Sequence, residues 1–245
     1  MFKRHVSAVL VALSFYVGTA FAADGQTGGY IPDKIAQSTV RLKLETPDGE
    51  YMVTGWGAAF GVDLSAMGAR DPRYLLSAAH LVLKKDGKGL ATGELRVEVP
   101  VNGKKVWSTC KVVAVDKKND ICLLHTDVDV PVVSMIAKDE SQNVGSTVMI
   151  VGCPSGVSPC VSVGRIADKN PNVDGHLWEA AATFYHGNSG GPVFDAQRGT
   201  VIGVAVAGVS NGQGDMRRDK ALFLPADEIK SFLEKTVAPL LAFRN

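Results

Sequence analysis

Short apolar segments separated by polar turns recur along most of this chain. Gly, Pro, Asp and Asn bound these segments, which are three to nine residues long. Such lengths and spacings are typical of an all-β protein. Six predicted strands lie in the first half of the chain, at residues 40–44, 52–60, 74–78, 95–99, 111–115 and 121–125. Six more lie in the second half, at residues 147–151, 160–166, 177–182, 192–194, 201–209 and 220–224.

One segment near the C-terminus has the periodicity of a helix instead. Residues 225–228 have a composition typical of a helix start, and apolar side chains then recur at helical spacing. These side chains are Ile229, Phe232, Leu233 and Val237. We therefore predict a helix at about residues 226–237 that packs on the second half of the chain.

A glycine-rich turn at residues 187–192, with the sequence GNSGGP, carries the strongest chemical signal. Glycines around Ser189 allow a tight turn in which the amides of Gly187 and Ser189 face a developing oxyanion. A serine hydroxyl is a weak nucleophile, so it needs a histidine to take its proton and a carboxylate to orient that histidine. The alternative is a hairpin whose serine only supports the turn.

His80 and Asp120 are the candidates for these two partners. His80 ends the apolar segment that begins at residue 74, and Asp120 occupies a polar turn that leads directly into the next strand. A charge at such a junction is half buried, which suits a carboxylate that orients a histidine. His186 lies only three residues before Ser189, so it is better placed to line a cleft than to act as the base.

These segments resemble the trypsin-like serine proteases of the chymotrypsin fold, in particular their compact bacterial HtrA-like branch. The order His80, Asp120, Ser189 is the order that this family uses. The matching sequences are LSAAH at residues 76–80, NDICLL at residues 119–124 and GNSGGPV at residues 187–193. The resemblance implies two six-stranded antiparallel β-barrels, at about residues 36–136 and 144–225, followed by the C-terminal helix.

The resemblance also implies a mechanism. Ser189 would attack a peptide carbonyl, His80 would act as base and then acid, and Asp120 would hold the histidine tautomer. The amides of Gly187 and Ser189 would form the oxyanion hole. Protein or peptide substrates are expected, and the reaction requires neither a metal nor an organic cofactor.

Residues near the serine turn are expected to set specificity. The predicted substrate-contacting residues are Thr183, Phe184, His186, Val204, Ala205 and Val206. No acidic residue in these segments would select Lys or Arg, so we expect a small or apolar residue before the scissile bond. Asn188 stands where animal digestive relatives have an aspartate that captures a new N-terminus, so that mode of activation is not expected. The chain ends at Asn245, and no PDZ module is expected after the protease domain.

The first 22 residues have the pattern of a secretory signal peptide. Lys3 and Arg4 precede an apolar stretch at residues 6–22, which ends in the small-x-small sequence AFA. We predict cleavage after Ala22, which leaves a protease domain at residues 23–245 in the periplasm or outside the cell. An uncleaved membrane anchor is the alternative, since the stretch is at the short limit for a spanning helix.

The charge of the chain does not favour a nucleic-acid partner. The sequence has 26 basic and 25 acidic residues, a net charge of +1, and loss of Lys3 and Arg4 with the leader changes this to −1. Short basic pairs occur in predicted turns and are best explained as solvated loops. No nucleic-acid partner is therefore predicted.

Four cysteines lie beyond the predicted leader, at Cys110, Cys122, Cys153 and Cys160. An even number in an exported chain favours disulfides. A bond between Cys153 and Cys160 would close the loop between two predicted strands, and one between Cys110 and Cys122 would bracket the turn that carries Asp120. Buried free thiols are the alternative for Cys110 and Cys122. None of the spacings is that of a zinc site.

Two other functions match parts of the pattern. A catalytically silent protein of the same fold would bind or scaffold a partner, although all three catalytic residue types are present. An α/β-hydrolase esterase would match Gly-x-Ser-x-Gly at residues 187–191, but that class places its serine before the histidine and at the start of a helix. We therefore predict an exported serine endopeptidase.

Overall fold

The structure is a computed structural model that describes residues 31–45, 56–133, 142–171, 176–210, 213 and 216–242. The predicted signal peptide at residues 1–22 lies outside the described residues, as does the beginning of the strand predicted at residues 52–60.

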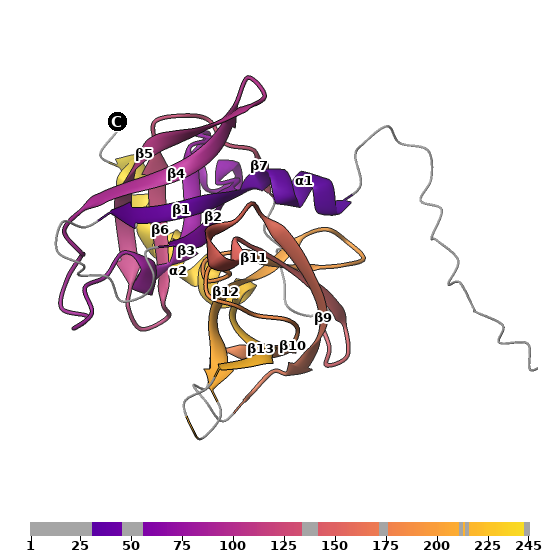
Figure 1. Cartoon of the computed structure of the whole chain (residues 1–245). Coiled ribbons are helices and arrows are strands. Elements are labelled where there is room, and N and C mark those ends of the chain that lie inside the picture. Colours follow the sequence, from indigo (N-terminus) through magenta and orange to yellow (C-terminus); the bar gives the residue numbers. More distant parts are fainter. Residues whose placement is uncertain are drawn as a thin grey trace, which may run out of the picture.

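The first barrel contains six antiparallel strands and one additional short strand (Figure 1). Around the barrel the order is β1 (Thr39–Glu45), β4 (Glu94–Val101), β5 (Lys104–Asp116), β6 (Ile121–Thr126), β3 (Tyr74–Ala78) and β2 (Trp56–Val62). Pairing of β1 with β2 closes the ring, and β7 (Val132–Val133) lies parallel to β2. Along β1, buried Val40, Leu42 and Leu44 alternate with polar residues, because successive side chains of a strand point to opposite faces.

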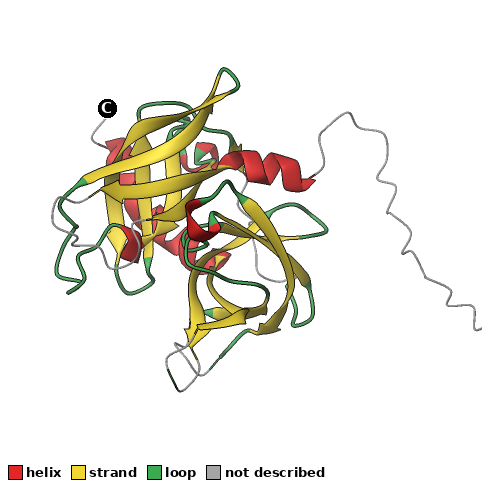
Figure 2. Cartoon of the chain, in the orientation of Figure 1, coloured by secondary structure: helices red, strands yellow, loops and turns green. Residues whose placement is uncertain are grey.

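The second barrel is closed by six strands in the order β10 (Trp178–Ala181), β13 (Met216–Pro225), β12 (Val201–Ser210), β11 (Pro192–Asp195), β8 (Thr147–Gly152) and β9 (Cys160–Asp168). Its interior holds aromatic side chains, among them Phe184, Trp178 and Phe223. Figure 2 shows that strands make up most of both barrels. The prediction of two six-stranded antiparallel barrels with a C-terminal helix is confirmed, and the structure adds β7.

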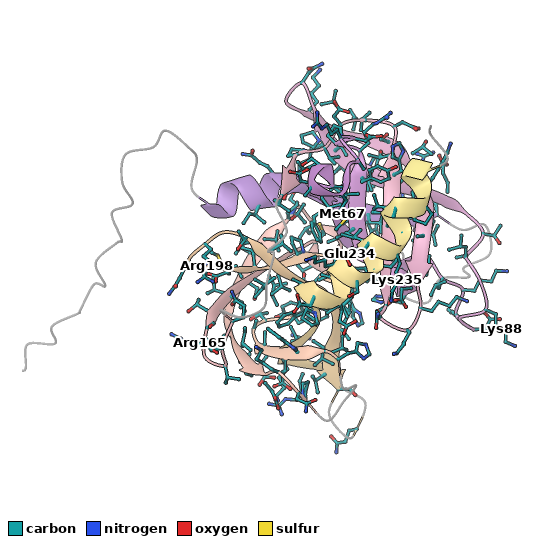
Figure 3. The ribbon with its side chains drawn as sticks, turned by 180° about the vertical axis from the view of Figure 1, so that it is seen from behind. Met67, Lys88, Arg165, Arg198, Glu234 and Lys235 are labelled. Atoms are coloured by element: carbon teal, nitrogen blue, oxygen red, sulfur yellow. The ribbon has the colours of Figure 1, made fainter. Side chains whose placement is uncertain are left out.

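Two α-helices of the described segments flank the barrels. The helix α1 (Ile31–Ser38) precedes β1, and the sequence pattern did not predict it. The C-terminal helix α2 (Ala226–Ala242) continues beyond the predicted end at about residue 237. It contacts β12 and β13 of the second barrel and also a 3-10 turn, η1 (Ser65–Met67), of the first (Figure 3). The sequence predicted that this helix packs on the second barrel alone. In the structure α2 packs on both barrels, so that prediction is incomplete. None of the helices in the described residues is long and apolar enough to cross a membrane.

The four cysteines are free thiols, so the predicted disulfides are not formed. In the ladder between β5 and β6, Cys110 lies opposite Thr126 and Cys122 opposite Val115. The two cysteines are thus four positions apart along the sheet, which corresponds to roughly 13 Å against a limit of about 7 Å between bridged Cα atoms. Cys153 is buried, whereas Cys160 is exposed and its Sγ donates a hydrogen bond to the Ser158 carbonyl at 3.3 Å.

Candidate active site

The pairing of β3 with β6 brings His80 and Asp120 together. Ala78, the last residue of β3, lies opposite Ile121, the first residue of β6. His80 follows β3 in the 3-10 turn η2 (Ala79–Leu81), and Asp120 immediately precedes β6. The Ala79 N–H donates a hydrogen bond to the Asp120 carbonyl at 3.1 Å and extends the ladder past the strand ends. The barrel itself therefore places the imidazole beside the carboxylate.

Both oxygens of Asp120 contact His80. Oδ2 lies 2.6 Å from Nδ1, and Oδ1 accepts the backbone N–H of His80 at 2.7 Å. A carboxylate at Nδ1 holds the ring proton on that nitrogen and leaves Nε2 as an acceptor. Asp120 has a φ of +52°, in the left-handed region that few residues other than glycine adopt. Strained backbone of this kind is concentrated at functional sites, where the surrounding structure maintains it.

Two backbone N–H groups of the Ser189 turn, unlike their neighbours, donate no hydrogen bond to a backbone carbonyl of the described residues. Asn188 donates to the Tyr185 carbonyl at 3.0 Å, Gly190 to Ala205 at 2.7 Å and Gly191 to Asn188 at 3.1 Å. Among the described residues, no backbone carbonyl accepts a hydrogen bond from the N–H groups of Gly187 and Ser189. The two amides that the sequence predicts as oxyanion donors are thus available to a ligand.

The same turn packs directly on the first barrel. The N–H of Ala58 in β2 donates to the Ser189 carbonyl at 2.9 Å. Gly190 has a φ of +83°, and a Cβ at this position would lie 2.1 Å from the Ala58 carbonyl oxygen and 2.3 Å from Ser77 Oγ. Only glycine allows this approach. Because Ser77 belongs to β3, which leads to His80, the serine turn lies against the end of the strand that precedes His80.

Ser189 and Asn188 are both largely buried, with 8% and 5% of their surface exposed. Ser189 Oγ donates a long hydrogen bond, 3.4 Å, to the Val206 carbonyl rather than to His80. Asn188 packs against Gly152, where a Cβ would lie 2.7 Å from Asn188 Oδ1. That Oδ1 has no hydrogen-bond partner in the described part of the chain.

The residues predicted to contact substrate are not all at the surface. Thr183 and His186 are exposed, but Phe184 is 1% exposed and packs in the core of the second barrel. The side chains of the β12 residues Val204, Ala205 and Val206 are also buried, so these residues present backbone to the surface of the turn. Burial in that core accounts for the apolar character of Phe184.

Two features beside this segment were not found from sequence. The exposed Tyr185 ring lies 5.2 Å from the guanidinium carbon of Arg218, and Phe184 N–H donates to the Arg218 carbonyl at 3.0 Å. Arg218 is 33 residues from Tyr185, so no local pattern connects them.

Among the described residues, no group of three or more His, Cys, Asp or Glu side chains is arranged to hold a metal ion.

Comparison with known proteins assigns the family. The family model described as "Trypsin-like peptidase domain" matches residues 59–204, which include His80, Asp120 and Ser189. The chain belongs to the trypsin-like peptidases.

A solved structure and a curated protein are also similar to this trypsin-like peptidase. The crystal structure of the Rv3671c protease from M. tuberculosis in its active form matches with a TM-score of 0.64 and 20% identity. The match covers 84% of this chain and 83% of that one, and it supports the chymotrypsin-like fold. The anti-sigma-I factor RsgI9 of Acetivibrio thermocellus is 28% identical over 163 residues, 65% of this chain. The match covers only 21% of that relative.

Proposed function

We propose that this trypsin-like peptidase is an exported serine endopeptidase with Ser189 as nucleophile, His80 as general base and Asp120 as the orienting acid. The observation that carries the proposal is the contact of Asp120 with both His80 Nδ1 and His80 N–H, at 2.6 and 2.7 Å. This geometry fixes one tautomer and leaves Nε2 to accept a proton, which is what a general base for serine requires. Export is proposed from the leader pattern of residues 1–22.

The reaction would proceed through an acyl-enzyme. Ser189 Oγ rotates from the Val206 carbonyl toward Nε2, gives its proton to His80 and attacks the scissile carbonyl. Its present hydrogen bond of 3.4 Å is near the limit of such bonds, so little is lost by the rotation. His80 then protonates the leaving amine, and a water activated by the same Nε2 releases the acyl group.

Charge that develops on the carbonyl oxygen would be stabilised by the N–H groups of Gly187 and Ser189. Their availability supports this role, because the neighbouring amides of the turn are already bonded to protein carbonyls. Removal of one such donor typically lowers turnover by about 10² to 10³. Asn188 is neutral and buried, so it offers no carboxylate that could pair with a charged N-terminus.

The first experiment compares the wild type with Ser189→Ala, His80→Ala and the double variant on an unfolded protein and a peptide library. We expect each single variant to lose at least about 10⁴ in kcat, and the double variant to lose no more than the worse single, since the two residues act as one unit. The control is Ser231→Ala, which removes an exposed hydroxyl on α2.

A fluorophosphonate probe gives a second readout. It should label the wild type at Ser189 and leave the Ser189→Ala variant unlabelled. A wild type that neither cleaves substrates nor reacts with the probe would overturn the proposal and favour a catalytically silent binding protein.

A further inference from the structure

The segment between β8 and β9 holds the backbone that precedes Ser189. The N–H of Cys153 donates to the Gly187 carbonyl at 3.0 Å, and the N–H of Ser155 donates to the His186 carbonyl at 2.8 Å. The C=O and N–H of one trans peptide point in opposite directions. A bond to the His186 carbonyl therefore directs the Gly187 N–H away from residues 153–156, and this N–H is one of the two proposed oxyanion donors.

This supporting segment has a conformation that needs support of its own. Ser155 has a φ of +53° and Gly156 a φ of +73°, so two consecutive residues are left-handed. A left-handed residue other than glycine is strained and persists only where its surroundings maintain it. The contacts that maintain the segment thus also maintain the orientation of the Gly187 amide.

Arg41 in β1 makes those contacts from the other barrel. Its Nη1 donates a hydrogen bond to the Gly156 carbonyl, and its Nη2 donates to Glu98 Oε1 at 2.6 Å. The guanidinium carbon lies 5.2 Å from the ring centre of Trp56 and 5.0 Å from that of Trp107. A planar guanidinium held by a carboxylate and two aromatic rings has little freedom to move.

The position of Arg41 in the sheet links it to the nucleophile as well. Arg41 lies opposite Ala58 in the ladder between β1 and β2, and the Ala58 N–H binds the Ser189 carbonyl at 2.9 Å. A single pair of opposite residues in the first barrel therefore contacts both parts of the site. Ala58 binds the serine turn, and Arg41 binds the segment at residues 153–156.

We propose that Arg41 is a positioning residue that, through the Gly156 carbonyl and the segment at residues 153–156, holds the Gly187 N–H in the orientation that stabilises the oxyanion. Arg41 touches neither substrate nor nucleophile. The inference rests on the proposed function, because it assigns a role to a residue outside the triad in the same reaction.

The test compares Arg41→Ala with Lys43→Ala. Lys43 is two residues along the same strand, and its Nζ lies 5.4 Å from the ring centres of both Trp56 and Trp107. The polar contact found for it is with Glu45, on its own strand. Lys43→Ala therefore removes a cation from the same aromatic pair without removing a bond to the segment at residues 153–156.

We expect Arg41→Ala to lower kcat by about 10²-fold, as loss of one oxyanion donor does, with KM nearly unchanged. A peptide boronate, which forms a tetrahedral adduct with the serine, should bind more weakly by a similar factor, while a non-covalent product peptide should bind as before. Arg41→Lys should recover part of kcat, since lysine keeps the charge but cannot bind Gly156 and Glu98 with one planar group. If Arg41→Ala does not fold, as judged by near-UV circular dichroism, Arg41→Lys decides the question by the same measurements.

Hydrogen exchange separates this inference from the proposed function. In a Ser189→Ala background, Arg41→Ala should speed exchange of the hydrogen-bonded amides of Cys153, Ser155, Gly156, Val157 and Asn188, while Lys43→Ala should not. An inactive wild type would overturn the proposed function, but the exchange result would still report on the contact. Wild-type kcat and boronate affinity in Arg41→Ala, or an equal loss in Lys43→Ala, would overturn the inference.

Discussion

Asp120 and Gly190 both have left-handed backbones, but for different physical reasons. At Asp120, φ is +52°, and in this backbone conformation the Asp120 carboxylate faces His80. At Gly190, φ is +83°, and the missing side chain allows the turn to lie against Ala58 and Ser77. The first residue contributes a functional group to the site, and the second contributes space.

Gly190→Ala should therefore lose both stability and activity. The added Cβ would lie 2.1 Å from the Ala58 carbonyl oxygen, so the turn must move away from β2. The matched control is Gly87→Ala, since Gly87 has a φ of +67° but a Cβ added there would meet no atom within 4 Å. We expect Gly87→Ala to cost about 1–2 kcal/mol of unfolding free energy with full activity. Chemical denaturation and peptidase assays should show a larger loss of stability and at least a hundredfold loss of kcat, the scale of a lost oxyanion donor, only for Gly190→Ala.

The sequence predicts functional residues best where they belong to a short local sequence motif. His80, Asp120 and Ser189 each stand in such a string, and the structure places the first two in contact. The burial of Phe184 could not be predicted, because an apolar residue in a loop has the same local pattern whether it faces a pocket or the core. Arg41 could not be found at all, since its partner Gly156 is 115 residues away.

At the level of elements, the hairpin formed by β8 and β9 brings together two thiols with opposite environments. Cys153 is buried, and burial raises the pKa of its thiol to about 12. Burial also raises the pKa of Cys110 to about 12 and that of Cys122 well above its ordinary value. The thiolate is the reactive form, so these three cysteines should be inert in the folded protein at neutral pH.

Titration of the native protein with Ellman's reagent at pH 8 should therefore modify one thiol, the exposed Cys160. After unfolding in guanidinium chloride, all four cysteines should react. The Cys160→Ser variant should show no rapidly reacting thiol in the native state. A wild type with no reactive thiol before unfolding and two after it would instead indicate that Cys153 and Cys160 are bonded.

The elements themselves were predicted well wherever a strand is long enough to show its pattern. All twelve predicted segments overlap strands of the two barrels. The strand β7 has only two residues, too few to show the alternating pattern of a strand, and its partner β2 is distant in sequence. The helix α1 is eight residues long and includes Pro32, which is too short a segment for helical periodicity to be evident.

At the level of the whole molecule, one hydrophobic cluster joins the two barrels, and the second barrel has a separate cluster of its own. Leu75 of β3, Val204 of β12 and Leu233 of α2 belong to the same cluster of buried residues. The sequence did not reveal this joint, because periodicity shows that a helix has an apolar face but not which surface covers it. This shared packing fixes the barrel that carries His80 against the barrel that carries Ser189, as the proposed function requires.

Leu233→Ala should destabilise both barrels together. Leu233 is 1% exposed, and removal of such a side chain costs about 2–5 kcal/mol of unfolding free energy. The control is Lys235→Ala, which changes an exposed residue of the same helix and should cost no more than about 0.5 kcal/mol.

The three tryptophans report on the two barrels separately, with Trp56 and Trp107 in the first barrel and Trp178 in the second. In a Trp178→Phe protein and in a Trp56→Phe, Trp107→Phe protein, fluorescence should give coincident urea transitions, which Leu233→Ala moves by the same amount. Two separate transitions, with only the second barrel shifted, would show that α2 stabilises that barrel alone and that the shared core does not couple the two halves of the site.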